Sequence, residues 1–96
     1  MEIEDYEIER IANRVVSLYP SLKFEGVKMI IDYSLLSLKF VLIYVKDLET
    51  IKKTINGIYD YCIDSIDGFS DVKMTLDHKK WIGEEIKDLF FLMIKQ

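Results

Sequence analysis

Apolar residues at helical spacing run through the first part of the chain. Between residues 5 and 19 they recur every three or four positions and form a single stripe on a helix. The stripe consists of Ile8, Ile11, Ala12, Val15, Val16 and Tyr19. Pro20 follows, and a proline disfavours helical geometry in the residue before it. We therefore predict a helix over residues 5–19, with Asp5 and Glu7 near its start, where the helix dipole favours negative charge.

Residues 27–45 alternate in a way that indicates two β-strands. Over residues 27–34 one face holds Val27, Met29, Ile31 and Tyr33, while the other holds Lys28, Ile30, Asp32 and Ser34. Over residues 37–45 both faces are apolar, with Leu38, Phe40, Leu42 and Tyr44 on one and Val41, Ile43 and Val45 on the other. A strand that is apolar on both faces is normally buried on both. We therefore predict that a second molecule covers Val41, Ile43 and Val45. The connection at residues 34–37 lacks the residues of a tight hairpin, and its geometry stays open.

A second long helix is predicted after Asp47, whose side chain is a good N-cap. Its apolar stripe runs over five turns and consists of Leu48, Ile51, Ile55, Ile58, Cys62 and Ile66. We expect Gly68 to end this helix in the left-handed conformation of a C-cap. Gly57 costs about 1 kcal/mol in a helix interior. We expect a neighbouring backbone to approach closely there.

The last part of the chain combines a short alternating segment with a helical pattern. Val72, Met74 and Leu76 predict a third strand, and Ile82, Ile86, Leu89, Phe90 and Met93 return to helical spacing. Residues 90–94 are all apolar, so this end is either buried or a docking element. The order α-β-β-α-β-α predicts a single two-layer α+β domain over residues 1–96. Its α-β-β-α core has an antiparallel sheet with helices on one face, followed by a C-terminal β-α extension.

Composition narrows the classes of protein that fit. The 96 residues are 50% hydrophobic and 31% charged, which excludes a disordered chain. A net charge of −4 argues against a nucleic-acid-binding module that works alone. One cysteine excludes a disulfide framework and a four-ligand zinc site. The N-terminus is acidic where a secretory signal is basic, and the most apolar stretch, residues 35–45, is shorter than the roughly 20 residues of a membrane span. We expect a soluble, cytoplasmic protein.

The reactive side chains form no clear catalytic set. Cys62 lies on the buried helix stripe, where desolvation raises a thiol pKa. His78, the single histidine, lies sixteen residues away and is interpreted as a loop or capping residue. One helix face carries three aspartates, Asp60, Asp64 and Asp67. They form either an acid–base group or, as we favour, the solvent-exposed side of the helix. We predict no catalytic residue and no cofactor.

The sequence signals for a metal site and for a nucleic-acid site are equally weak. The acidic N-terminal residues form either a loose cation site or, as we favour, a solvated helix start; they are Glu2, Glu4, Asp5, Glu7 and Glu9. The chain has two pairs of adjacent lysines, Lys52-Lys53 and Lys79-Lys80. Each pair is interpreted either as an RNA contact within a larger assembly or as ordinary surface. Trp81, Phe90 and Phe91 have the spacing of core aromatics, with base stacking or partner anchoring as the alternative. We predict no resident metal.

Residues 27–67 resemble the small dimerisation subunit of the KEOPS complex, the Pcc-type family, and in particular its archaeal paralogue. The resemblance depends on the apolar segment at residues 39–45, the helix opener Asp47, the Ile51-Lys52 step and Asn56-Gly57. The apolar spacing of residues 61–66 is also similar. The chain lacks the leading strand of that family, has lysine and glycine where the family has arginine and serine, and carries an extra tail beyond Gly68.

The resemblance implies a non-catalytic accessory subunit that pairs with the main small subunit through their sheets. The complex installs threonylcarbamoyl on tRNA, and the catalytic subunit and the tRNA would be reached only through the complex. The predicted partner interface is Val41, Ile43, Val45, Lys52, Lys53 and Asn56. Homodimer and heterodimer both stay open. The alternatives are a small phage or mobile-element protein that inhibits a host enzyme, and a small enzyme that uses carboxylates such as Asp60 and Asp64.

Overall fold

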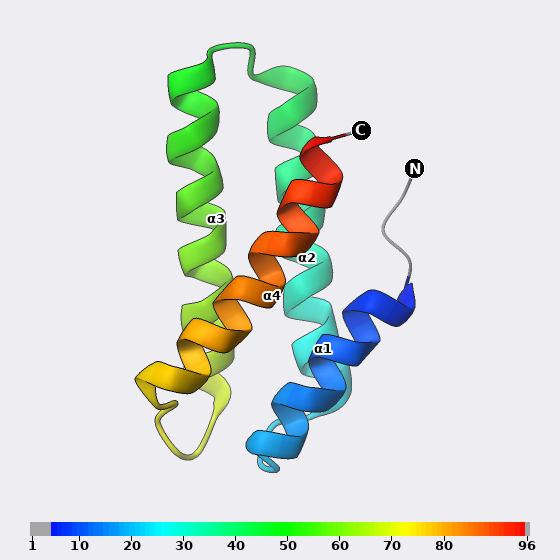
Figure 1. Cartoon of the computed structure of the whole chain (residues 1–96), viewed down its shortest axis with the longest axis vertical. Coiled ribbons are helices and arrows are strands. Elements are labelled where there is room, and N and C mark those ends of the chain that lie inside the picture. The colour runs from blue at the N-terminus through cyan, green and yellow to red at the C-terminus, as the bar shows by residue number, and fades with distance from the viewer. Residues whose placement is uncertain (1–4, 96) are drawn as a thin grey trace.

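Four helices joined by three short connections make up residues 5–95, the part of the chain that this computed structural model describes (Figure 1). They are α1 (Asp5–Leu18), α2 (Phe24–Tyr44), α3 (Leu48–Phe69) and α4 (Leu76–Ile94). The predicted α+β class is therefore wrong: the described residues contain no strand and no sheet.

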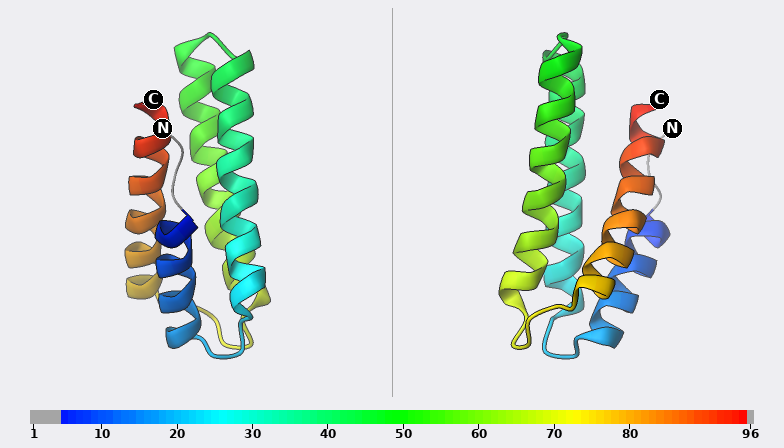
Figure 2. Two further views of the ribbon diagram at one scale, coloured as in Figure 1. Left: turned by 90° about the vertical axis from the view of Figure 1, so that its right-hand side faces the viewer. Right: turned by 60° about the vertical axis from the view of Figure 1, so that its left-hand side comes forward.

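The helices form two layers. The two longest, α2 and α3, pair as an antiparallel hairpin that α1 and α4 cover on one face only (Figure 2). The principal extents are 40 × 24 × 18 Å, and the tip of the hairpin extends beyond α1 (Figure 1). One broad face of the hairpin therefore has no neighbour among the described residues.

Local signals account for the helix ends that were predicted. Helix α1 ends at Leu18, two residues before Pro20, close to the predicted limit. Asp47 caps α3 as predicted, because its Oδ2 accepts the backbone N–H of Thr50 at 2.9 Å. Thr75 caps α4 in the same way, with its hydroxyl accepting from the N–H of His78 at 3.2 Å.

The two strands predicted over residues 27–45 are one continuous helix, α2. Residues two positions apart share a face of a strand but lie about 200° apart around a helix. Val27 and Ile31 are buried whereas Met29 and Tyr33 are exposed, so the predicted strand face is divided between opposite sides of α2. The segment that lacked hairpin residues, 34–37, is simply helix interior.

Two further predictions are corrected near the end of α3. Gly68 lies inside the helix, which ends at Phe69 with Ser70 as its C-cap, and no described glycine has a positive φ. The predicted third strand is an irregular connection, residues 70–75, followed by the start of α4. Met74 is buried there, while Val72 and Leu76 are exposed.

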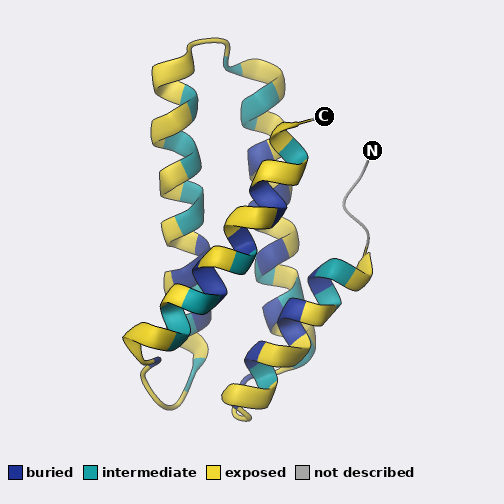
Figure 3. Cartoon of the chain, in the orientation of Figure 1, coloured by how far each residue is buried: buried dark blue, intermediate teal, exposed yellow. Residues whose placement is uncertain are grey.

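The core lies where α4 crosses the hairpin and where α1 packs beside α2 (Figure 3). Its most deeply buried large side chains are Ile11, Val15, Val27, Ile31, Leu38, Cys62, Ile66, Ile82 and Ile86. No residue from 39 to 61 is buried, because the hairpin tip is only a two-helix contact. The apolar C-terminal run is divided: Phe90 is buried and Phe91 is exposed.

Candidate protein-binding surface

A stripe of large apolar side chains runs along the uncovered side of α2. Its members are each between 49% and 62% exposed, and they are Met29, Tyr33, Leu36, Phe40 and Ile43. Consecutive members are four, three, four and three residues apart. This alternation keeps side chains on one line of a helix over a length of about 21 Å. We call these five residues the α2 outer stripe.

The outer stripe lies opposite the side of α2 that builds the core. Met29 and Leu36 are each two positions from a buried residue, Ile31 and Leu38 respectively, which places them about 200° away around the helix. A helix with apolar stripes on two opposite sides needs two sets of neighbours. The core supplies one set, whereas the members of the outer stripe remain about half exposed within the described residues.

Charged residues follow one edge of the outer stripe in an ordered way. Glu25 and Asp32 lie beside its first half, Lys39 lies beside its second half, and Lys46 lies in the connection that follows α2. All four side chains are exposed. Partial burial raises the pKa of Asp32, nearby Lys28 lowers it and Asp5 raises it. The edge is therefore acidic at one end and basic at the other.

An apolar groove of about 470 Å³ adjoins the N-terminal end of the outer stripe. Its walls include Leu22, Gly26, Met29, Tyr33, Tyr61 and Phe69. A methyl group at Gly26 would meet no atom within 4 Å, so the groove floor is open there. Tyr33 and Tyr61 also line a second hollow of about 450 Å³ between α2 and α3. The two hollows together follow the α2–α3 seam on the uncovered face.

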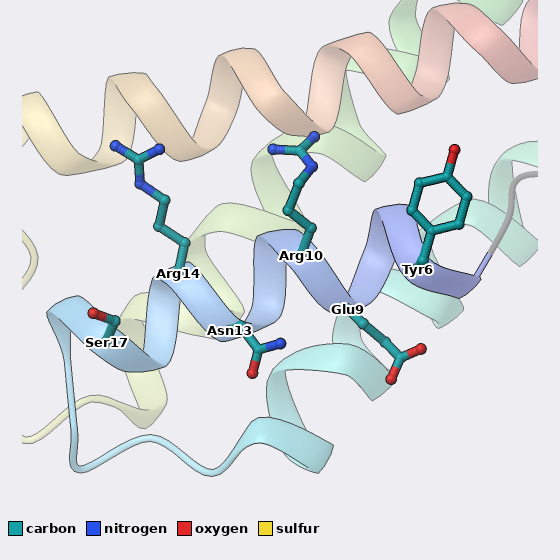
Figure 4. Close-up of a pocket in the computed structure, with 6 residues that line it drawn as sticks. All are labelled: Tyr6, Glu9, Arg10, Asn13, Arg14 and Ser17. Atoms are coloured by element: carbon teal, nitrogen blue, oxygen red, sulfur yellow. The ribbon is translucent and has the colours of Figure 1, made fainter.

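A third and larger hollow lies along α1 and is lined by that helix alone (Figure 4). Both arginines of the chain lie here, and both reach toward α4. Arg10 Nη2 lies 2.9 Å from Glu85 Oε2, a hydrogen bond that raises the arginine pKa further, and the Arg14 guanidinium lies 4.4 Å from the ring centre of Trp81. These cations hold α1 against α4. Both cations that line the hollow therefore already have partners on α4.

The residues predicted at the partner interface are not brought together. Ile43 belongs to the outer stripe, whereas Val41 is half-buried on another side of α2 and Val45 is the half-buried C-cap beyond its end. Their predicted common face depended on the strand that the structure replaces with a helix. Lys52, Lys53 and Asn56 are exposed on α3 and line neither of the hollows beside the stripe. The signal that sequence reasoning missed is the alternation of four and three between Met29 and Ile43.

Cys62 and His78 do not form a catalytic pair. Cys62 is fully buried as predicted, and desolvation raises the pKa of its thiol to about 11, partly offset by the Ser34 hydroxyl. A thiol with this pKa is almost entirely protonated at neutral pH. His78 Nδ1 instead lies 2.6 Å from the hydroxyl of Tyr19, in the first turn of α4.

The three aspartates of α3 have different surroundings. Asp60 and Asp64 are exposed, but Asp67 Oδ1 accepts the backbone N–H of Met74 at 2.8 Å and Oδ2 pairs with Lys79 at 3.0 Å. These two bonds lower the pKa of Asp67. Asp67 is thus a structural carboxylate that holds the α3–α4 connection.

The remaining candidates take ordinary surface or core positions. Lys80 is exposed, Trp81 is half-buried under Arg14, and Phe91 is exposed on α4. Among the acidic residues, Glu2 and Glu4 lie outside the described residues, and Asp5 is exposed at the start of α1. Residues 5–95 contain no group of three or more histidine, cysteine, aspartate or glutamate side chains placed to hold a metal ion.

Comparison with known proteins adds no assignment: no family model, curated protein or solved structure matches this chain. Within residues 5–95, no helix has both the length and the apolar character to cross a membrane.

Proposed function

We propose that this chain is a non-catalytic protein-binding module that engages another helix through the α2 outer stripe. The observation that carries the proposal is a line of five large apolar side chains, from Met29 to Ile43, on the side of α2 opposite the core. Contiguous exposed apolar surface of this kind marks interaction sites in folded proteins. Its spacing is that of a helix–helix seam rather than of a small-molecule pocket.

The neighbouring features support a macromolecular partner. The groove at the N-terminal end of the stripe is long, apolar and continuous with the α2–α3 seam, which suits an inserted helix. The reactive groups of the chain are used elsewhere: Cys62 in the core, Asp67 and His78 in the α3–α4 connection. The enzyme considered as an alternative would depend on Asp60 and Asp64, which are exposed and line none of the three hollows.

A role as a KEOPS accessory subunit stays a prediction. The resemblance implied pairing through sheets, and the described residues form helices at those positions. The proposal therefore depends on the helical surface and not on that family. Inhibition of a host enzyme by a phage or mobile-element protein is one form that binding through this surface would take.

The test compares two leucine substitutions. Leu36→Glu places a carboxylate in the middle of the outer stripe, whereas Leu76→Glu changes an 83% exposed leucine at the start of α4. We expect Leu36→Glu to lose bound protein in quantitative affinity purification from the native source. Leu76→Glu should retain it, and both variants should keep the helical circular dichroism of the parent. Equal binding by both variants would contradict the proposal.

A further inference from the structure

We infer that the α2 outer stripe binds the α2 helix of a second copy of this chain, with the two helices antiparallel. The inference rests on the proposed function, because it names the occupant of the same surface. It depends on three features of the described residues: the order of charges beside the stripe, the match of bulky side chains to open space, and the area available.

The order of charges selects an antiparallel partner. Glu25 and Asp32 precede Lys39 along the same edge of α2, and Lys46 follows in the connection just beyond the end of the helix. When a second α2 runs in the opposite direction, its basic end lies beside the acidic end of the first. Asp32 then faces Lys39 of the second copy, and Glu25 lies toward the basic end of the second α2, where the connection carrying Lys46 follows. The two-fold axis repeats the Asp32–Lys39 pair, so one dimer contains two of these attractive contacts.

In a parallel pair of α2 helices these charges would face uncharged residues. In a parallel coiled coil each edge residue faces the other edge of the partner helix. The other edge of this stripe holds Ile30, Ser37 and Tyr44, which carry no charge. A parallel dimer therefore leaves Asp32 and Lys39 without partners, whereas the antiparallel dimer pairs them.

The same register also pairs the apolar side chains of the two copies across the interface. It places Tyr33 against Leu36 of the second copy, Met29 against Phe40, and Gly26 against Ile43. Gly26 has open space above it, so the Ile43 side chain meets no obstacle there. The groove beside Gly26 would also face Phe40 and Tyr44 of the second copy, which are exposed and stacked on each other at 6.0 Å. Bulky residues at one end of α2 therefore meet the hollow at the other end.

The exposed area is sufficient for a dimer. Five large side chains, each about half exposed, present on the order of 500 Å² per chain. Two copies would bury about 1,000 Å² through these residues alone, which reaches the lower limit of specific interfaces. The walls of the groove and the flanking charged side chains add to this area. A two-fold arrangement also closes the contact, so no larger polymer follows.

The test is a charge exchange, measured by sedimentation equilibrium of the purified full chain in low-salt buffer. The parent protein is expected to be a dimer. Asp32→Lys and Lys39→Asp each convert two attractive contacts per dimer into repulsive ones, and each should weaken dimerisation about tenfold. The double variant D32K/K39D restores opposite charges across the interface and should recover the parent affinity to within about threefold. High salt should reduce the differences among these variants.

Leu36→Glu and Leu76→Glu complete the set. The first should yield a monomer with the helical content of the parent, and the second should leave the dimer unchanged. A parent protein that stays monomeric overturns the inference, and so does a double variant that is as weak as the single ones. If the parent is monomeric but Leu36→Glu still releases a different bound protein, the proposed function stands without the homodimer. If Leu36→Glu changes neither kind of association, both proposals fail.

Discussion

The Tyr19 hydroxyl and Nδ1 of His78 lie 2.6 Å apart and join the end of α1 to the first turn of α4. The two rings meet edge to face, with centroids 5.3 Å apart. The Tyr19 oxygen also accepts the backbone N–H of Thr75 at 3.0 Å. The Tyr19 hydroxyl therefore pairs with two polar groups at the start of α4, which are 56 and 59 residues further along the chain.

Removal of this hydroxyl is expected to destabilise the fold. Tyr19→Phe keeps the ring in the core but leaves the Thr75 N–H and the His78 ring without their partner. We expect a loss of about 1–2 kcal/mol in the free energy of unfolding, measured by chemical denaturation. Tyr6→Phe is the matched control, because Tyr6 is 67% exposed and should lose less than about 0.5 kcal/mol. Equal losses in the two variants would argue against the bridging role.

Asp67 is expected to make stability depend on acid pH. Hydrogen bonds from Met74 and Lys79 lower its pKa in the folded chain, so folding favours the ionised carboxylate. This stabilisation is complete above the unfolded value, near 3.8, and is lost as the pH falls through the lower folded value. Asp67→Asn should therefore be about 1 kcal/mol less stable than the parent at pH 7.

The difference between Asp67→Asn and the parent should shrink as the pH falls from 4 toward 2, because the parent carboxyl becomes neutral there. Urea denaturation across this range measures the effect. Asp64→Asn changes an exposed carboxylate one turn earlier in α3 and should match the parent at pH 7. A gap between Asp67→Asn and the parent that stays constant down to pH 2 would exclude the ionised Asp67 as its source.

Two glycines in helix interiors are expected to respond oppositely to alanine. A methyl group at Gly83 would collide with the Tyr59 side chain, whereas one at Gly57 would meet nothing within 4 Å. The close approach expected at Gly57 therefore occurs at Gly83, and it involves a side chain rather than a backbone. Gly57→Ala should raise the free energy of unfolding by about 0.5–1 kcal/mol, the usual gain in helix propensity. Gly83→Ala should lower it by about 1 kcal/mol, because the ring must move.

The reason for the Gly83 effect can be tested in a double-mutant cycle. Tyr59→Ala removes the obstructing ring, so the further change Gly83→Ala should then be neutral or stabilising. If Gly83→Ala costs the same in both backgrounds, the contact with Tyr59 is not the cause.

The sequence predicts the helices whose apolar pattern has a single stripe. Ile8 to Tyr19 and Leu48 to Ile66 each follow one line, and Asp47 marks a start that the structure confirms through its bond to Thr50. Pro20 likewise marks where α1 has ended. In these segments local chemistry and tertiary packing agree, so the pattern is sufficient.

Helix α2 was misread because it is apolar on two opposite sides. Met29 and Ile31 differ by two positions, a step that keeps one face in a strand and changes sides in a helix. The β-branched and aromatic residues of this segment strengthen the strand interpretation. The same two-sided pattern indicated an uncovered apolar surface, and that expectation has its physical basis in the outer stripe. The strand period was wrong, and so were the faces assigned from it; a molecule that covers this surface stays a prediction.

Neighbouring aspartate substitutions near the end of α2 should separate the two sides of this helix. Ile43 is 50% exposed on the outer stripe, whereas Val41 is half-buried. Both residues lie in the last turn of α2, so the unfavourable interaction of a carboxylate with the helix C-terminus is common to both. Val41→Asp should cost about 2 kcal/mol or more in unfolding free energy, because its carboxylate is partly removed from water.

Ile43→Asp should leave the free energy of unfolding of the monomer nearly unchanged, because its carboxylate stays in water there. It should weaken self-association instead, because a second helix would remove this carboxylate from water. Unfolding at low protein concentration measures the first effect, and sedimentation at high concentration measures the second. A stable Val41→Asp variant that is monomeric, beside a dimeric Ile43→Asp variant, would place the interface on the opposite side of α2. That result would identify the side of the hairpin tip that carries Val41, and not the outer stripe, as the surface that a partner covers.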